Sequence, residues 1–302
     1  MLGRALVTGS EGFTGNYVCN ALRTAGWDVW GTGLRPNNAS SQYVVCELTQ
    51  AAQVSELVKR VKPDVVIHLA AVSFVAHGDP EAFYTVNVIA TRNLLAALTA
   101  GTSPPKCVIL ASSANIYGNR TEGSLREDAL PDPANDYAVS KLAMEYVARL
   151  WMDKLPIVIT RPFNYTGVGQ SENFLIPKII KHFKERAPVI ELGNLDVSRD
   201  FSDVRDVARA YVKLAERQPT GEIVNLCSGQ CFSLEQLIDL TSCISGHSLT
   251  ITINPAFVRG NEVRLLKGDR RRLEALTGYW EPLPLSATIE WMLRNSSTIA
   301  TC

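Results

Sequence analysis

The sequence predicts an α/β fold: a doubly wound parallel sheet with a smaller C-terminal region. Short apolar runs alternate with helix-length segments through the first half of the 302 residues, which is the pattern of consecutive βαβ units. The first apolar run leads into a glycine-rich turn. After about residue 163, proline and glycine become frequent and irregular polar stretches separate shorter elements. This change indicates a second region that covers the open end of the sheet.

Strands and helices follow one another in the first region. Strands are expected at residues 4–7, 28–30, 65–69, 108–110 and 157–160, and helices at residues 13–25, 54–61, 81–100 and 138–152. The consecutive apolar residues Val65-Val66-Ile67 are typical of a strand covered on both faces. A helix at 204–216 and a strand at 223–226 are expected to return to the same sheet. The domains are therefore expected at residues 1–165, with 203–228 added, and at residues 166–302.

The overall charge and the cysteine content narrow the choice of partners. Thirty basic and thirty acidic side chains cancel, so we expect neither nucleic acid nor a membrane as partner. No apolar run approaches the roughly 20 residues that span a bilayer. The seven cysteines are scattered and no signal peptide precedes the first strand, so reduced thiols and a cytoplasmic location are expected. The four histidines lie far apart, and no metal site is expected.

The glycine turn follows the first strand and opens a helix. It runs Thr8-Gly9-Ser10-Glu11-Gly12-Phe13-Thr14-Gly15, with a GxxGxxG spacing in place of GxGxxG. The three glycines permit a sharp turn, a close approach of a pyrophosphate and tight packing of helix on strand. Free N–H groups at the start of the helix then hold the phosphates. Because the turn stands between a strand and a helix, it predicts a dinucleotide site in a Rossmann-like domain.

The end of the second strand distinguishes the two nicotinamide cofactors. An acidic residue there binds the ribose 2′-hydroxyl of NAD(H), whereas an arginine pairs with the 2′-phosphate of NADP(H). Val29-Trp30-Gly31 is followed by Thr32-Gly33-Leu34-Arg35, and no carboxylate occurs before Glu47. The sequence therefore favours NADP(H) with Arg35 as the phosphate clamp, while NAD(H) stays open because Arg35 could be an ordinary surface residue.

A tyrosine and a lysine stand four residues apart on one predicted helix. In Tyr137-Ala138-Val139-Ser140-Lys141 both side chains project from the same face, and a nearby cation is expected to lower the pKa of the phenol and make it an acid/base for carbonyl chemistry. Ser112 and Ser113 end the preceding strand, at the edge of the sheet where ligands of this fold bind. A serine hydroxyl there is expected to hold the reacting oxygen beside the tyrosine.

These motifs, in this order, resemble those of the extended short-chain dehydrogenases that act on nucleotide sugars. The match also includes His68-Leu69-Ala70-Ala71, Ser112-Ser113-Ala114-Asn115-Ile116-Tyr117-Gly118 and Arg161-Pro162-Phe163-Asn164. The resemblance implies a catalytic triad of Ser113, Tyr137 and Lys141, with Lys141 also on the nicotinamide ribose, and a homodimer formed through helices 81–100 and 138–152. It implies cofactor contacts from Gly9, Gly12, Phe13, Thr14, Gly15, Arg35, Glu47, Leu48, Leu69, Ala70, Ala71, Tyr137, Lys141 and Pro162.

The second half is similar to the branch of that family that uses GDP-sugars. The similarity lies in Gly193-Asn194-Leu195-Asp196-Val197-Ser198-Arg199-Asp200-Phe201 and in Arg259-Gly260-Asn261-Glu262-Val263. It implies that the guanosine diphosphate is held by Asn164, Lys178, Arg199, Arg259 and Glu262. Ser73 and Asn115 are the candidates for contacts to the sugar. Two positions depart from the family pattern: Glu47 replaces an aspartate, and the segment after Arg259 lacks the usual proline and alanine.

Asn115 narrows the reaction. The related 4,6-dehydratases carry a glutamate at that place and the related GDP-fucose synthases a cysteine, and an asparagine can do neither acid/base task. The resemblance thus implies a reductase of deoxysugar and polysaccharide biosynthesis, in which NADPH reduces C4 of GDP-4-keto-6-deoxy-D-mannose to GDP-D-rhamnose or to its C4 epimer GDP-6-deoxy-D-talose. The alternatives are a GDP-mannose 4,6-dehydratase, a GDP-sugar epimerase, and a non-enzymatic NADP-sensing regulator.

Overall fold

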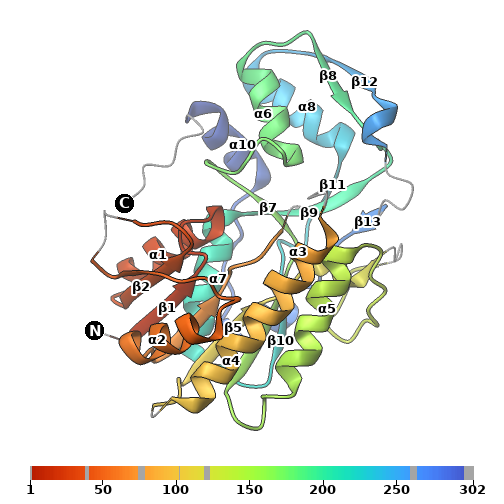
Figure 1. The fold of residues 1–302 in the computed structure, drawn as a ribbon. Coiled ribbons are helices and arrows are strands. Elements are labelled where there is room, and N and C mark those ends of the chain that lie inside the picture. The colour runs from red at the N-terminus through yellow and green to blue at the C-terminus, as the bar shows by residue number, and fades with distance from the viewer. Residues whose placement is uncertain are drawn as a thin grey trace.

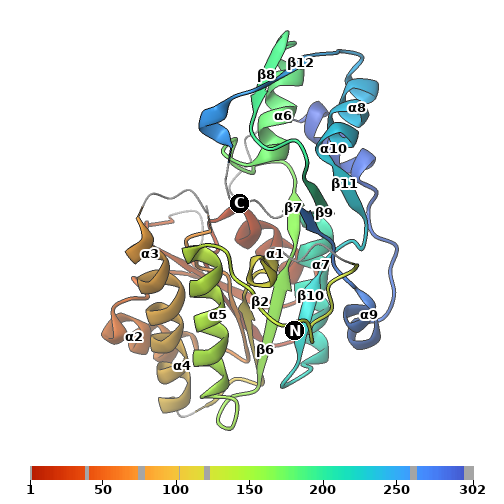
Figure 2. The same ribbon diagram turned by 90° about the vertical axis from the view of Figure 1, so that its right-hand side faces the viewer.

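The protein was analysed as a computed structural model, which describes residues 2–37, 41–73, 79–101, 103–118, 123–258 and 264–295. The elements form a larger lobe around one sheet and a smaller lobe above it (Figure 1, and Figure 2 from the side). Among the described residues, no helix has both the length and the apolar character needed to span a bilayer. In the same residues, no three His, Cys, Asp or Glu side chains gather as a metal site would require.

The larger lobe is built on seven strands that are all paired in parallel. Their order across the sheet is β10 (Ile223–Leu226), β6 (Ile157–Pro162), β5 (Cys107–Ala111), β4 (Val65–His68), β1 (Arg4–Thr8), β2 (Asp28–Gly33) and β3 (Tyr43–Val45). The chain moves outward from β1 in one direction and then from β4 in the other. The predicted doubly wound sheet is confirmed, and its switch point between β1 and β4 is where ligands of such sheets bind.

Helices cover both faces of this sheet. One face carries α1 (Phe13–Thr24), α7 (Val204–Arg217) and α9 (Arg271–Thr277), and the other carries α2 (Ala51–Val61), α4 (Ala90–Ala100) and α5 (Asp136–Arg149). Val65 and Ile67 pack into the first core and Val66 into the second, so the consecutive apolar residues are buried on opposite faces. The helix predicted at 204–216 and the strand predicted at 223–226 are α7 and β10.

The helix predicted at 81–100 has three parts. It starts as α3 (Pro80–Tyr84), passes through a π-helical turn (Thr85–Ile89) and continues as α4. The turn carries Asn87, which is buried and donates from Nδ2 to Ser140 Oγ at 3.0 Å and exchanges hydrogen bonds with the backbone of Val72. A π-turn of this kind often marks a functional site. Here Asn87 joins α5 to the loop after β4.

The smaller lobe has its own apolar core. α6 (Leu175–Lys184), α8 (Leu234–Ser245) and α10 (Leu285–Arg294) pack around it beside the parallel pair β8 (Val189–Leu192) and β12 (Thr250–Ile253). A four-stranded sheet connects this lobe to the larger one, and its strands are β7 (Asn164–Thr166), β9 (Ser198–Asp203), β11 (Cys231–Ser233) and β13 (Leu265–Leu266). The open end of the main sheet therefore faces a second body.

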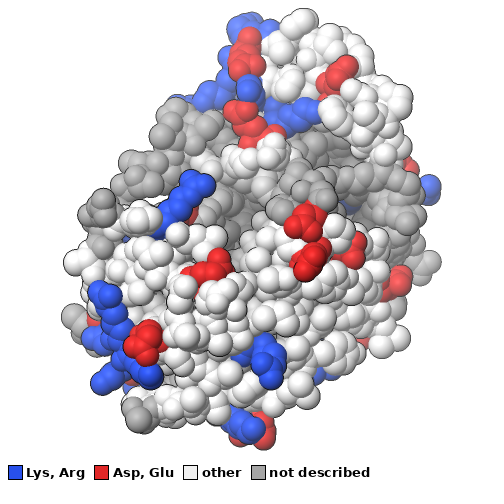
Figure 3. Space-filling model, in the orientation of Figure 1, with Lys and Arg blue, Asp and Glu red and all other residues white. Residues whose placement is uncertain are grey.

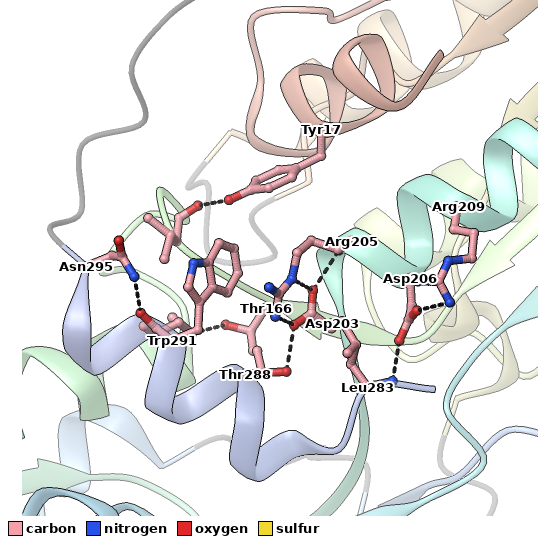
Figure 4. A network of polar contacts seen from close by, with 12 residues as sticks. Tyr17, Thr166, Asp203, Arg205, Asp206, Arg209, Leu283, Thr288, Trp291 and Asn295 are labelled. Carbon is pink, nitrogen blue, oxygen red and sulfur yellow. Dashed lines mark hydrogen bonds and ion pairs between the residues drawn. The ribbon is translucent and has the colours of Figure 1, made fainter. Parts of the chain in front are cut away.

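Polar and aromatic contacts fasten α10 to the larger lobe (Figure 4). Asp203 accepts from the Arg205 guanidinium at 2.7 Å and from Thr288 Oγ1 at 2.7 Å. The Arg205 guanidinium lies 3.9 Å from the Trp291 ring centroid, and the Tyr17 hydroxyl donates to the Val168 carbonyl at 2.8 Å. Since Tyr17 lies on α1, these contacts hold the helix of the glycine turn against the smaller lobe.

Candidate functional site

A cleft of about 780 Å³ opens between the lobes at the carboxyl ends of the central strands. The surface is hollowed there, and basic and acidic side chains are interspersed over the face shown (Figure 3). The structure brings most of the predicted site residues to this cleft. They are Gly9, Gly12, Phe13, Thr14, Gly15, Leu69, Ala70, Ala71, Ser73, Ser113, Asn115, Tyr137, Lys141, Pro162, Asn164 and Arg199.

The glycine turn fits a dinucleotide. Gly9 has a φ of +67°, and a Cβ at this residue would lie 2.9 Å from the Ala70 backbone. A Cβ at Gly15 would lie 2.1 Å from the Gly9 carbonyl oxygen, so only glycine allows α1 to approach the turn this closely. Gly12 caps α1 without a side-chain hydrogen bond, which leaves the first N–H groups of the helix to an anion.

Ser113 and Tyr137, two residues of the predicted triad, lie together in the cleft lining. Their side chains are hydrogen-bonded, and both residues are buried. The expectation that Lys141 lowers the pKa of Tyr137 is wrong for this structure, because burial raises the pKa of Tyr137 to about 12 and the Ser113 hydrogen bond is what opposes that rise. Desolvation of the phenolate outweighs the neighbouring hydroxyl.

Lys141 lies one helical turn beyond Tyr137 and is also buried. Its ammonium donates to the Ala111 carbonyl at 2.8 Å. Burial lowers the pKa of Lys141 to about 8, while the Glu145 carboxylate on the next turn opposes that decrease. An ammonium with this pKa is poised to lose its charge just above neutral pH.

The hydroxyl of Ser113 is held by its neighbour Asn115. The backbone N–H and the side-chain amide of Asn115 each donate to Ser113 Oγ at 3.2 Å. These contacts form where the chain leaves β5 and enters a 3₁₀ turn (Ala114–Tyr117). Asn115 therefore positions the Ser113 hydroxyl in addition to lining the cleft.

Two buried polar clusters lie near the predicted triad, and sequence reasoning missed both. His68 bridges the Thr8 and Thr91 hydroxyls at 2.7 and 2.9 Å, and burial, with Lys141 adding to it, lowers the pKa of His68 to about 3. His68 is therefore neutral at physiological pH. Arg161 pairs with Glu145 through two hydrogen bonds of 2.9 and 2.8 Å. The only signal in the sequence was that Arg161 and His68 fall within matched motifs.

Some predicted residues lie away from the cleft lining. Arg35 is exposed beyond β2. Glu47 accepts from the Thr49 backbone and hydroxyl at 3.1 and 3.0 Å, so its carboxylate is turned onto its own loop. Leu48 is buried in the core beside α2. Arg259 and Glu262 lie outside the described residues.

Lys178 does not line the cleft, but it contacts Phe257, which does and which sequence reasoning did not single out. The Lys178 ammonium donates to the Glu191 carbonyl at 2.7 Å and lies 4.4 Å from the Phe257 ring centroid. Phe257 lines the cleft with 47% of its surface exposed. A Cβ at Gly193 would lie 2.2 Å from the Phe257 carbonyl oxygen, so the glycine permits this segment to close on β8. An exposed aromatic ring beside a cation is a platform for a nucleobase.

The cleft lining contains only a few kinds of titratable side chain. Among the described residues that line it there is no Asp, Glu, His or Cys. The titratable side chains in that lining are Tyr137, Tyr165, Tyr211, Lys141 and Arg199. Two further polar atoms, Ser112 Oγ and Asn164 Nδ2, are buried without a partner among the described residues. Such groups at a cleft are satisfied by a bound ligand or by ordered water.

The sequence matches a known enzyme family. Residues 5–227 match the NAD dependent epimerase/dehydratase family. GDP-6-deoxy-D-talose 4-dehydrogenase of Aggregatibacter actinomycetemcomitans is 34% identical over 294 residues, which cover 97% of each chain. GDP-6-deoxy-D-mannose reductase of Pseudomonas aeruginosa is 35% identical over 306 aligned positions, which cover 97% of this chain and 96% of the reductase.

Solved structures agree with this match. The crystal structure of a putative epimerase from Burkholderia cenocepacia is 51% identical, with a TM-score of 0.90 and 96% of each chain covered. The structure of RMD from Pseudomonas aeruginosa complexed with NADPH is 31% identical, with a TM-score of 0.84, and the match covers 96% of this chain and 98% of that one. The fold, the glycine turn and these similarities together show that the chain belongs to the NAD-dependent epimerase/dehydratase family and is an NAD(P)-dependent enzyme.

Proposed function

We propose that this enzyme reduces the C4 ketone of GDP-4-keto-6-deoxy-D-mannose and so forms GDP-D-rhamnose. The observation that carries the proposal is a buried Ser113–Tyr137 pair in a cleft whose described lining has no Asp, Glu, His or Cys. Reduction of a ketone needs one proton donor beside the carbonyl oxygen. Elimination of water, or inversion beside the ketone, needs a further acid or base, and the carboxylate, imidazole and thiol groups suited to that task are absent from the described lining. The relatives of similar length that act on GDP-6-deoxy sugars support this choice of substrate.

Three side chains are assigned roles in the proposed reaction. The reduced nicotinamide supplies the hydride when it is bound. Tyr137 donates its proton to the C4 oxygen, and Ser113 hydrogen-bonds that oxygen and then the phenolate that remains. The Lys141 ammonium is assigned to the nicotinamide ribose. The raised pKa of Tyr137 means that the phenol is fully protonated at neutral pH, as a proton donor must be.

The two ligands are assigned to different lobes. We propose that residues 1–165, with 203–228, hold the dinucleotide through the glycine turn, Leu69, Ala70, Ala71 and Pro162, with Arg35, Glu47 and Leu48 at the adenosine end. We propose that residues 166–302 hold the nucleotide sugar. α9 is an exception, because Leu273 belongs to the core of the larger lobe.

The guanosine diphosphate is assigned to the smaller lobe and its border. Phe257 and Lys178 hold the base by stacking and by a hydrogen bond from the ammonium. Arg199 lines the cleft and pairs with the phosphates. The orphaned amide of Asn164 finds an acceptor on the nucleotide, and Ser73 and Asn115 face the sugar. Arg259 and Glu262 remain assigned to the diphosphate and the ribose.

The configuration at C4 is the finer choice. The two similar enzymes at 34% and 35% identity are named for opposite configurations at C4, talose and mannose. GDP-6-deoxy-D-talose is therefore the alternative product. The nuclear magnetic resonance spectrum of the reduced sugar decides between them, because the coupling between H3 and H4 is large for an axial H4 and small for an equatorial one.

Two rival reactions are separated by their substrates and by cofactor use. A 4,6-dehydratase converts GDP-mannose to a 4-keto sugar without added NADPH, and this reaction is expected to be absent. An epimerase with a tightly held cofactor interconverts two sugars without net oxidation of NADPH. Formation of a 4-keto product from GDP-mannose, or conversion of the keto sugar with no oxidation of NADPH, overturns the proposal.

The assembly and location belong to the same proposal. Four apolar side chains are exposed here: Ile89 on the π-turn (46%), Val139 (38%) and Tyr146 (56%) on α5, and Leu150 (74%) directly after α5. α4 and α5 lie side by side on the outside of the larger lobe (Figure 2). We propose that this face forms a homodimer, which a mass measurement by light scattering tests. The cysteines of the described chain are all free, which supports a reducing compartment such as the cytoplasm.

A further inference from the structure

The carboxylate of Glu11, in the middle of the glycine turn, has no part in the proposed reaction. In Rossmann-like folds the end of the second strand distinguishes NAD(H) from NADP(H), because an acidic side chain there accepts from the adenosine ribose, whereas an arginine pairs with the 2′-phosphate. In this chain β2 ends at Gly33, which has no side chain. Whatever contacts the ribose at this point must therefore come from another residue.

Glu11 brings a carboxylate to that point from the glycine turn. A Cβ built on Gly33 would lie 3.1 Å from Glu11 Oε2 and 2.6 Å from the Tyr43 hydroxyl. The two side chains thus fill the space that a side chain at position 33 would enter. Sequence reasoning found no carboxylate between β2 and Glu47 because it looked only along the chain after β2.

The sheet fixes the residue that holds Glu11. Tyr43 is the first residue of β3 and is paired in register with Gly31 of β2. Its hydroxyl donates to Glu11 Oε2 at 2.9 Å and lies equally far from the Arg35 carbonyl oxygen. Burial, and then the Glu11 carboxylate, raise the pKa of Tyr43, so this hydroxyl keeps its proton and remains a donor.

We propose that Glu11 is the residue that discriminates between NAD(H) and NADP(H). Its carboxylate accepts hydrogen bonds from the adenosine ribose hydroxyls, and it opposes the 2′-phosphate of NADP(H) because two negative charges at short range repel. The proposal rests on the dinucleotide part of the proposed function and not on the identity of the sugar.

Arg35 acts in the opposite direction. It follows Gly33 by two positions and is exposed, and an arginine there attracts a 2′-phosphate. The preference of the enzyme is the balance between these two side chains. Removing the charge of Glu11 leaves the arginine unopposed, so the preference moves toward NADP(H).

The test is a pair of dissociation constants, for NADH and for NADPH, measured by quenching of tryptophan fluorescence with no sugar present. They are compared between the wild type and Glu11→Gln. Glutamine keeps an oxygen that accepts from Tyr43, so the turn keeps its support while the negative charge is removed. The ratio of the NADPH constant to the NADH constant is expected to fall by about tenfold in the variant, and by less at high ionic strength.

Glu56→Gln is the matched control, because it neutralises an exposed carboxylate that pairs with Lys59 on α2. Its ratio should equal that of the wild type. An unchanged ratio in Glu11→Gln, with both cofactors still bound, overturns the proposal. Since no keto sugar enters the measurement, failure of the proposed reduction leaves this test intact, and the two proposals fail separately.

Discussion

Asn115 donates two hydrogen bonds to the Ser113 hydroxyl, one from its backbone N–H and one from its side-chain amide, each at 3.2 Å. A serine hydroxyl has two acceptor lone pairs and one proton. With both lone pairs occupied, the proton of Ser113 is directed to its other partner, Tyr137. A hydrogen bond donated to the phenol oxygen favours the phenolate, so Asn115 acts on Tyr137 through Ser113 and is a positioning residue.

Replacing Asn115 by leucine tests this relationship. Without the side-chain amide, the Ser113 hydroxyl is free to turn away, and the pKa of Tyr137 rises further. In the direction of alcohol oxidation, which uses the phenolate as base, the rising limb of kcat/KM against pH is expected to move to higher pH, and kcat at neutral pH to fall by about tenfold. If the rising limb of kcat/KM stays at the same pH, the positioning role of Asn115 is contradicted, whatever the change in kcat.

Replacing Tyr137 by phenylalanine removes the proton donor and little else. The ring of Tyr137 lies 5.9 Å from that of Phe83, and this contact is kept in the variant. Turnover is expected to fall by at least about a thousandfold, whereas NADPH binding measured by fluorescence stays close to that of the wild type. Turnover that survives at the wild-type level rules out Tyr137 as the donor.

We predict that cofactor binding depends on pH through the charge of Lys141. Burial lowers the pKa of Lys141 to about 8, so the ammonium is present below that pH and is lost as the pH rises through it. If Lys141 holds the nicotinamide ribose, the affinity for NADPH decreases between about pH 7 and pH 9. Lys141→Met is expected to bind more weakly and to show no transition in this range. An affinity of the wild type that is constant from pH 7 to pH 9 contradicts the assignment.

We predict that breaking the ion pair of Glu145 and Arg161 lowers the unfolding free energy and shifts the pH transition in NADPH binding. Both side chains are almost completely buried, so Glu145→Gln leaves the Arg161 charge without its partner and is expected to cost about 3 kcal/mol of unfolding free energy. Because the Glu145 carboxylate raises the pKa of Lys141, its loss moves the transition in NADPH binding to lower pH. Denaturant unfolding and the binding profile measure the two effects independently.

A double variant, Glu145→Leu with Arg161→Met, is expected to recover part of the stability, since it removes both charges.

We predict that removal of the Phe257 ring weakens the binding of the nucleotide and leaves the chemical step unchanged. Phe257→Ala removes the ring beside Lys178 and is expected to weaken GDP binding by about tenfold, the low end of what a stacked base contributes. The KM for the nucleotide sugar rises accordingly, and kcat at saturation is unchanged because the reacting groups lie elsewhere in the cleft. Val258→Ala is the matched control, because Val258 is equally exposed but does not line the cleft. Equal GDP affinity in both variants contradicts the assignment of the ring to the base.

The larger lobe was predictable because its sequence signals are strong and local. Val65-Val66-Ile67 identifies a strand covered on both faces, and Gly9 and Gly15 occupy positions where a Cβ would collide with backbone. The π-turn at Thr85–Ile89 was not predicted, since an inserted residue in a long helix leaves little trace in the apolar pattern. β3 was also missed, because it is only three residues long and half exposed.

The smaller lobe and the finer parts of the site depend on contacts between distant segments. β8 alternates exposed and buried residues and β12 is mostly exposed, so neither short strand shows a long apolar run. Phe257 reaches the cleft only because Gly193 lets its segment close on β8. The effect of Lys141 on Tyr137 was inferred from helical spacing alone, and spacing contains no information on burial, which outweighs it here.

The central claim is that one ketone is reduced by one reduced dinucleotide at this cleft. The direct measurement supplies purified protein with GDP-4-keto-6-deoxy-D-mannose and a limiting, known amount of NADPH, and follows the absorbance of the cofactor together with the amount of GDP-6-deoxyhexose formed. The account predicts one alcohol for each NADPH oxidised, and no reaction with Tyr137→Phe. Loss of the keto sugar without oxidation of the cofactor, or no loss at all with active-site binding intact, would contradict it.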